Sequence, residues 1–418
     1  MLQDLRMDRS AAEEMDRRDS LASFRGRFAI GDGEPIYMDG NSLGRPPTEV
    51  TDAVISGLAD WRSRLVSGWE DWIELPAAVG DRLGRILGAA EGQTLVCDST
   101  TVNLYKLASA ALGARDDRSV IVGDSADFPT DRYVLEGLAQ ATGRELRLVR
   151  AGSDTDDRTE ALSEAIADNT ALVCLSHVNY RSGARLDVRR LTEVAHANGA
   201  LVLWDLAHSA GAVPVDLDGW GVDLAVGCTY KYLNSGPGSP GFLYVRRELQ
   251  DRLRQPIWGW FGRAGQFEMG PGYEPAPGVA SYMTGTPGIL GLLAVDSSLK
   301  VVEEAGVEAL WAKSQQLTSM LIELIDAELV PLGAALATPR APESRGAHVS
   351  VSHPEAWAWC RTLVQRGLVV PDFRTPDVIR LGPAPLYTRY VDCYDAVRRM
   401  AETLTGDFDV VAAPGRVT

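Results

Sequence analysis

Short apolar runs alternate with amphipathic segments through the middle of the chain. Each run is bounded by turn residues and has the length expected of a β-strand. The runs are almost continuously apolar, which is typical of a mostly parallel sheet buried between helices. The pattern therefore predicts an α/β fold. The predicted strands are Thr94–Asp98, Ser119–Gly123, Glu145–Val149, Ala171–Ser176, Leu201–Asp205, Leu224–Gly227 and Phe242–Val245.

The pattern changes after residue 258. A Gly/Pro-rich stretch from Gly259 to Gly288 predicts a long functional loop, because simple connections rarely exceed about 12–15 residues. Helices are expected over Gly288–Ala305 and Ala309–Leu329, followed by a strand at His348–Ser352. We predict an N-terminal arm over residues 1–50, a large domain over 51–295 and a small C-terminal α/β domain over 296–418.

Composition narrows the range of partners. The chain has 418 residues, of which 45% are hydrophobic and 23% charged, and its formal net charge is −16. A surface this acidic repels phosphate backbones and anionic lipids, so nucleic acid and membranes are not expected partners. The five cysteines form no CxxC pair, and the N-terminus lacks the apolar core of a signal peptide. We expect a soluble, cytoplasmic protein without a metal site.

A carboxylate and a lysine follow two of the predicted strands. Asp205 ends one strand and Lys231 lies just after another. Ligands of open α/β sheets bind at the carboxyl ends of the strands, so the two side chains are expected at one site. There a lysine forms a Schiff base with pyridoxal phosphate, and an aspartate keeps the pyridine nitrogen protonated. Either residue alone is better explained by an ordinary surface or strand-end position, and it is their combination that favours the cofactor.

Other strand ends offer further cofactor contacts. The segment Asp98–Asn103 ends a strand and opens a helix, where hydroxyl groups and free amides bind an anion, or simply cap the helix. Phe128 follows another strand and either covers a pyridine ring or belongs to the core. The sequence Gly236–Gly241 matches GxGxxG but precedes a strand rather than a helix, so a dinucleotide fold is rejected.

Several motifs together resemble the kynureninase family, and the similarity runs from about Asp19 to Asp395. Their combination is far more specific than an isolated lysine pattern. The motifs are Tyr37-Met-Asp-Gly-Asn-Ser-Leu-Gly44, Ser176-His-Val-Asn-Tyr-Arg-Ser-Gly183, Trp204-Asp-Leu-Ala-His-Ser-Ala-Gly-Ala-Val-Pro-Val215, Gly227-Cys-Thr-Tyr-Lys-Tyr-Leu-Asn-Ser-Gly-Pro-Gly238, Gly259-Trp-Phe-Gly262 and Arg380-Leu-Gly-Pro-Ala-Pro-Leu-Tyr387.

The resemblance implies a pyridoxal-phosphate enzyme of fold type I, whose large domain binds the cofactor and which forms a homodimer with shared active sites. Lys231, Tyr230 and Asp205 would be catalytic, with Tyr230 as proton donor. Arg380 would bind the substrate α-carboxylate, unless it is a buried structural residue. The implied cofactor contacts are Thr100, Thr101, Phe128, Asp131, Ser176, Asp205, His208, Tyr230 and Lys231, with Trp260 and Thr286 expected from the partner subunit.

The implied reaction is hydrolytic Cβ–Cγ cleavage of kynurenine or 3-hydroxykynurenine, giving anthranilate or 3-hydroxyanthranilate and alanine in tryptophan catabolism and NAD biosynthesis. Trp61, Trp69 and Trp72 are candidates for the wall of the aryl pocket, or core residues. The chain departs from the family at Arg263, where the family usually has a histidine close to the substrate. A second departure is Gly285, at a position where a small hydroxyl-bearing residue is expected from the family. These changes keep open a diverged substrate, such as an S-conjugated cysteine undergoing β-elimination or decarboxylative deamination. A pseudoenzyme or binding protein is the third hypothesis, disfavoured by Lys231, Asp205 and Arg380 occurring together.

Overall fold

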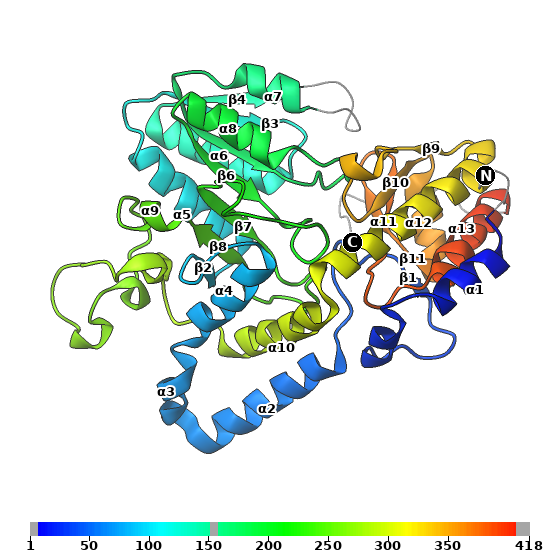
Figure 1. Cartoon of the computed structure of the whole chain (residues 1–418), viewed down its shortest axis with the longest axis horizontal. Coiled ribbons are helices and arrows are strands. Elements are labelled where there is room, and N and C mark those ends of the chain that lie inside the picture. The colour runs from blue at the N-terminus through cyan, green and yellow to red at the C-terminus, as the bar shows by residue number, and fades with distance from the viewer. Residues whose placement is uncertain (1–6, 151–157, 407–418) are drawn as a thin grey trace.

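A seven-stranded sheet forms the centre of the larger part of the chain in the computed structural model, which describes residues 7–150 and 158–406 (Figure 1). Its strand order is β2-β8-β7-β6-β5-β3-β4. Only β8 runs antiparallel to its neighbours within this sheet, so the mostly parallel α/β fold is confirmed. The strands are β2 (Thr94–Val96), β3 (Val120–Asp124), β4 (Glu145–Val149), β5 (Thr170–Ser176), β6 (Leu201–Asp205), β7 (Leu224–Gly227) and β8 (Phe242–Val245).

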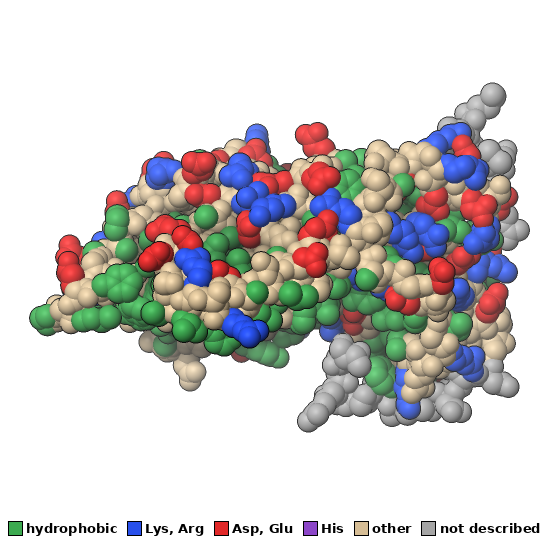
Figure 2. Space-filling model, turned by 90° about the horizontal axis from the view of Figure 1, so that it is seen from below, with side chains coloured by type: hydrophobic (Ala, Val, Ile, Leu, Met, Phe, Trp, Pro, Cys, Tyr) green, Lys and Arg blue, Asp and Glu red, His purple; other side chains and the backbone are tan. Residues whose placement is uncertain are grey.

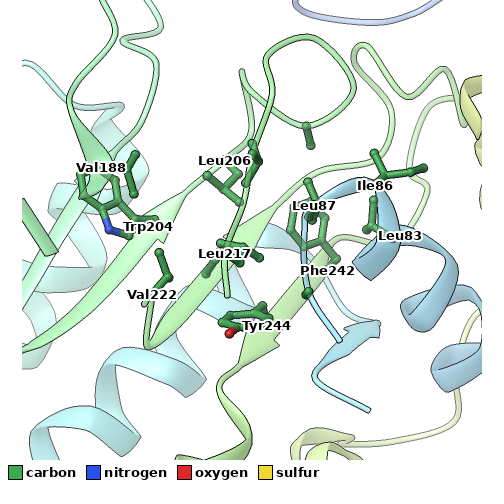
Figure 3. Packing of buried hydrophobic residues seen from close by; sticks show 14 of the residues in the cluster. Leu83, Ile86, Leu87, Val188, Trp204, Leu206, Leu217, Val222, Phe242 and Tyr244 are labelled. Atoms are coloured by element: carbon green, nitrogen blue, oxygen red, sulfur yellow. The ribbon is translucent and has the colours of Figure 1, made fainter. Parts of the chain in front are cut away.

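Alternate side chains of the strands enter two separate apolar cores. In β6, Val202 and Trp204 face one core, and Leu201 and Leu203 face the other. This follows from the two-residue period of a strand, and it explains why strands covered on both sides are apolar at every position. Figure 3 shows the first core, where Trp204 lies beside Val188 and Phe242 lies near Leu83 and Ile86 of α4 (Leu75–Ile86).

Helices cover both faces of this sheet (Figure 1). The helices α5 and α6 contribute to the second core, whereas α4, α8 and α10 contribute to the first. The helix α7 also contributes to the first core through Leu162, and α9 contributes to the second through Leu249. Besides α4, the helices around this sheet are α2 (Thr48–Arg64), α3 (Trp69–Trp72), α5 (Thr100–Gly113), α6 (Pro129–Thr142), α7 (Thr159–Ala165), α8 (Val188–Ala197), α9 (Arg247–Gln250) and α10 (Ile289–Ala305).

The C-terminal part has its own antiparallel sheet and its own core. Its strand order is β12-β13-β10-β9, and α11, α12 and α13 pack against it. The N-terminal helix α1 (Arg9–Arg17) lies beside α13, and β1 (Ile36–Tyr37) pairs with β11 (Val369–Val370). The other elements are α11 (Val307–Leu324), β9 (Ala335–Leu336), β10 (Val349–Ser352), α12 (Ala356–Gln365), β12 (Asp372–Arg374), β13 (Val378–Leu381) and α13 (Tyr390–Thr405).

Two features of the C-terminal half differ in detail from the sequence pattern. The helix expected over Ala309–Leu329 is α-helical only to Leu324 and continues as a π-helical turn over Ile325–Leu329, shortly before Pro331, which cannot extend the hydrogen-bond ladder. Residue 296, the predicted domain boundary, lies inside α10, so the division into domains stays a prediction. Among the described helices, none combines the length and apolar character that crossing a membrane requires.

Candidate active site

A cavity of about 210 Å³ lies where several strands of the large sheet end and the C-terminal part approaches them. The ends of β6 and β7 supply Asp205 and the segment leading to Lys231, while β12 and β13 supply two arginines. The described residues lining it are Asn41, Ser42, Thr100, Thr101, Phe128, Thr130, Asp131, Ser176, Tyr180, Asp205, Ala207, His208, Tyr230, Lys231, Arg374 and Arg380.

Lys231 lies against a buried imidazole. Its Nζ is 3.0 Å from His208 Nε2. Burial lowers the pKa of His208 well below its ordinary value, and the neighbouring Lys231 adds to the effect. His208 is therefore neutral at physiological pH, with Nε2 accepting from Lys231 and the proton on Nδ1. That Nδ1 is buried and has no hydrogen-bond partner in the described part of the chain.

Two buried carboxyl groups share a hydrogen bond beside Lys231. Burial raises the pKa of Asp131 well above its ordinary value, and the carboxylate of Asp205 raises it further. Asp131 therefore keeps its proton and donates to Asp205, while Ser176 Oγ donates to Asp131 Oδ2 over 3.4 Å. The amide of Ala207 also donates to Asp205 Oδ1 over 2.9 Å. The result is one fixed carboxylate facing a neighbouring lysine.

The first turn of α5 forms an anion-binding corner of the cavity. Ser99 caps the helix by accepting from the Val102 amide, and Thr100 and Thr101 lie in the first turn. Amides at a helix N-terminus point outward and favour negative charge. A Cβ at position 241 would lie 2.8 Å from the Thr100 nitrogen, so Gly241 leaves this approach unobstructed.

Two aromatic side chains bound the cavity near Lys231. Cys228 and burial raise the pKa of Tyr230, so its hydroxyl stays protonated at neutral pH. Phe128 is 41% exposed and packs edge-to-face on Tyr180 with ring centroids 5.2 Å apart. A partly exposed phenyl ring on a cavity wall is available to cover a planar ligand.

The opposite end of the cavity is basic. Arg380 is buried and pairs with Asp372, and its Nη1 donates to the Tyr180 carbonyl over 2.6 Å. Its Nη2 donates to Ser42 Oγ over 2.8 Å. With the Asn41 amide oriented to satisfy both groups, its oxygen accepts from Arg380 Nε at 3.2 Å. The guanidinium is therefore rigidly held at the cavity wall.

Three residues predicted from the sequence do not line this cavity. Trp260 and Thr286 are exposed in the long loop that precedes α10. Arg263 Nη1 donates to the carbonyls of Ala264 and Gly265 over 2.8 Å, so its guanidinium is hydrogen-bonded within its own loop. The candidate aryl-pocket tryptophans, Trp61, Trp69 and Trp72, are also absent from the described lining.

Sequence reasoning assigned no role to several lining residues. Asn41 and Ser42 belong to the N-terminal motif, and Tyr180 to the motif after β5, so motif membership was an available signal. Arg374 lies outside those motifs. A larger cavity of about 590 Å³ lies elsewhere, beside His177 and Trp220, and the described residues lining it include none of the predicted site residues.

The side chains of the smaller cavity fit pyridoxal phosphate. Lys231 is an amine for the aldehyde, Asp205 a fixed carboxylate for the pyridine nitrogen, and the first turn of α5 a phosphate corner. The unpartnered Nδ1 of His208 is a buried donor that the protein alone leaves unsatisfied. Each donor type matches one polar group of this cofactor.

The same fold occurs in solved pyridoxal-phosphate enzymes. A cysteine desulfurase from Thermococcus onnurineus NA1 superposes with a TM-score of 0.81 at 18% identity, covering 92% of this chain and 98% of that one. A C-DES variant with glycine covalently linked to its PLP cofactor superposes with a TM-score of 0.79 at 18% identity, covering 90% and 99%. Fold and cavity together define a pyridoxal-phosphate enzyme of fold type I, as the sequence predicted.

Sequence similarity identifies the family within this class. The model of the kynureninase C-terminal domain matches residues 310–400. A kynureninase from Pseudomonas fluorescens is 44% identical over 399 residues, covering 93% of this chain and 94% of the relative. One from Burkholderia pseudomallei (strain 1106a) is 41% identical over 405 residues, covering 95% of each. The chain belongs to the kynureninase family, and its resemblance to that family is confirmed.

Proposed function

We propose that this chain hydrolyses the Cβ–Cγ bond of L-kynurenine or its 3-hydroxy form, releasing alanine and the corresponding anthranilate. The observation that carries this proposal is the arrangement of one cavity, with Lys231 and a fixed carboxylate at one end and Arg380 at the other. Such a cavity orients an amino acid by its carboxylate while presenting its Cα to a lysine.

The guanidinium of Arg380 is the proposed anchor for the substrate α-carboxylate. Hydrogen bonds to Tyr180, Ser42 and Asn41 fix its plane before substrate arrives. A guanidinium held in this way can still donate to a carboxylate with little loss of side-chain entropy. The same contacts fix the distance between the carboxylate and Lys231.

Proton transfer at Cα is the proposed work of Lys231. Bound pyridoxal phosphate supplies an electron sink for an amino acid linked to it. Asp205 would hold a proton on the ring nitrogen, since its carboxylate is buried and fixed by Ala207 and Asp131. The amine of Lys231 would remove the Cα proton, and His208 beside it would accept a hydrogen bond from Nζ.

Cleavage requires water and a proton donor. Water adds to the γ-carbonyl carbon, the Cβ–Cγ bond breaks with its electron pair on Cβ, and a proton is delivered to Cβ. The return of the Cα proton from Lys231 then completes alanine. We assign that donor role to Tyr230, whose raised pKa keeps its hydroxyl protonated. The aryl carboxylate leaves as the second product, so the atoms of substrate and one water are accounted for.

We also propose that two copies of the chain form a homodimer. The helix α2 and the turn after it expose Ile55, Trp61, Leu65 and Val66, with Val66 81% exposed. Figure 2 shows hydrophobic side chains across the face of the molecule on the side of α2. Exposed apolar surface of this extent is typical of an interface. Trp260 and Thr286 do not line the cavity of their own chain. In the homodimer, these two residues of each copy would line the cavity of the other.

Subunit complementation tests the shared site. Lys231→Ala and Trp260→Ala variants are each expected to be nearly inactive, because each removes one half of the site. After mixing under conditions of subunit exchange, hybrid dimers would carry one intact site and recover activity. Mixed samples that stay inactive, despite exchange shown by mass spectrometry, would contradict a site built from both subunits.

The diverged substrate is the second candidate, and its basis was Arg263. That guanidinium donates to carbonyls of its own loop and does not line the cavity of its own chain. The cysteine-cleaving enzymes share the fold at 18% identity, whereas the kynureninases share sequence over almost the whole chain. Kynurenine is therefore the better-supported substrate.

Product analysis tests the proposal. The cofactor-loaded enzyme is incubated with kynurenine and, separately, with 3-hydroxykynurenine, and both products are quantified by mass spectrometry. Alanine and the matching anthranilate in equal amounts, absent with Lys231→Ala, are the expected result. Intact substrate with a normally bound cofactor would contradict it and direct the assay to S-conjugated cysteines. A role in tryptophan catabolism follows only if kynurenine is consumed.

A further inference from the structure

Arg380 has little capacity left for a substrate. Its Nε faces Asn41, its Nη1 donates to the Tyr180 carbonyl, and its Nη2 is engaged by Ser42 and Asp372. The whole residue is 1% exposed. A guanidinium has five N–H groups, so these contacts leave too few free for a two-pronged grip on a carboxylate.

A second arginine lines the same cavity with its donors less committed. Arg374 has a side chain that is 23% exposed, and its one ion pair runs from Nη2 to Asp372 Oδ2 over 2.8 Å. Its contact with Ser42 Oγ is long, at 3.5 Å. The Nε of Arg374 is buried without a hydrogen-bond partner in the described chain. Buried donors of this kind normally have an acceptor, and here a ligand can provide one.

The charge of this corner also calls for an anion. Asp372 is shared between Arg374 and Arg380, so one carboxylate faces two guanidinium groups. The carboxyl group of Asp39 also interacts with both arginines, and burial raises its pKa. The three paired residues therefore carry one excess positive charge at the cavity wall, and a substrate carboxylate would neutralise it.

We propose that Arg374 is a second carboxylate-binding residue, which donates to the substrate α-carboxylate beside Arg380. The inference rests on the proposed function for the identity of the amino acid, but not for the carboxylate itself. Arg380 is held in one orientation by its hydrogen bonds and has few free N–H groups. Arg374 supplies the further N–H donors that the carboxylate needs. Together they select amino acids over amines without a carboxylate.

The rival explanation is that Arg374 only balances Asp372. Ligands with and without a carboxylate distinguish the two roles. L-alanine carries the α-carboxylate and no aryl group, and ethylamine is the same molecule without the carboxylate. Binding of each to the holoenzyme is followed by the change in cofactor absorbance, with Arg374→Gln, Arg374→Lys and wild type compared.

Arg374→Gln is expected to weaken alanine binding by about 10- to 100-fold, the usual cost of losing a charge-assisted hydrogen bond. Ethylamine binding should change by less than about twofold, and Arg374→Lys should restore part of the alanine affinity by keeping a cation for Asp372. The matched control is Arg398→Gln, which removes a partly buried ion pair with Glu328 outside the cavity and should leave both affinities unchanged.

Equal weakening of both ligands, or no weakening of either, would overturn the proposal. Thermal unfolding of each holoenzyme variant identifies a loss that comes from misfolding, in which case Arg374→Lys provides the comparison. Kynurenine cleavage by the wild type is assayed in parallel. A wild type that leaves kynurenine intact but loses alanine affinity on Arg374→Gln would refute the proposed function and support the carboxylate site.

Discussion

The two ends of the active-site cavity carry opposite charge: one end is acidic and the other is basic. At the cofactor end, Asp205 and Asp131 are buried together, and one of them keeps a proton. At the substrate end, Arg374 and Arg380 are paired with a single carboxylate, Asp372. In the proposed function, the first end would stabilise a positively charged ring nitrogen, and the second an anionic carboxyl group.

The two ends also come from different parts of the fold. The acidic end is built on strands of the large parallel sheet, whereas both arginines come from the antiparallel C-terminal sheet. A substrate bound between them contacts both parts at once. Its orientation thus depends on how the two parts pack, and substitutions at each end should affect different kinetic constants.

The largest expected effect is at the cofactor end. Lys231→Ala removes the proposed base and should lower kcat by about 10²- to 10⁴-fold, the range that general acid–base catalysis contributes. The variant should still bind the cofactor through the other contacts of the cavity. Product formation is measured by mass spectrometry, and circular dichroism checks the fold. A variant that retains a tenth of the activity would exclude Lys231 as the base.

At the substrate end, Arg380→Lys should reduce kcat/KM by about 100-fold. A lysine cannot reproduce the planar fork that contacts Ser42, Asn41 and Tyr180. The loss should appear mainly in KM, because the carboxylate is held throughout the reaction. Steady-state kinetics with kynurenine measure it. A change confined to kcat would indicate that Arg380 positions the reacting atoms instead of binding the substrate.

The contrast between the two ends marks how far the sequence could lead. Apolar strands ending in Asp205 and followed by Lys231 predicted the acidic end, because parallel strands finish at one edge of a sheet. Arg374 could not be found in this way. Its place depends on pairing between β12 and β13 and on the packing of that sheet against the cavity. Long-range packing of this kind leaves no local signal.

The paired carboxyls should make the cofactor-free enzyme sensitive to pH. Asp131 has its pKa raised in the folded state and about 3.9 when unfolded, so its contribution to stability is present below pH 4 and is lost as pH rises through the folded pKa. Asp131→Asn does not titrate and can still donate to Asp205. Its stability relative to wild type should therefore increase by about 1.4 kcal/mol per pH unit above pH 4, until the folded pKa is reached.

Urea unfolding of the cofactor-free proteins at pH 5 and pH 8 measures this difference. Substitution of the exposed Asp60, which pairs with Arg64 at 3.4 Å, by Asn provides a control whose relative stability should stay nearly constant. A difference between Asp131→Asn and wild type that does not grow with pH would show that Asp131 is not protonated in the fold.

The smallest effect is expected from Ser176→Ala. The hydroxyl donates to Asp131 over 3.4 Å, a long hydrogen bond, and the Ser176 amide keeps its contact with Asp127 Oδ2 at 3.1 Å. A hydrogen bond of this kind is worth at most about 1 kcal/mol, so kcat should fall by less than about tenfold. Because Ser176 also hydrogen-bonds to Asp205, at the cofactor end, the change should appear in kcat and not in KM. Steady-state kinetics that showed a raised KM instead would place Ser176 at the substrate end, and the separation of the two ends would not hold.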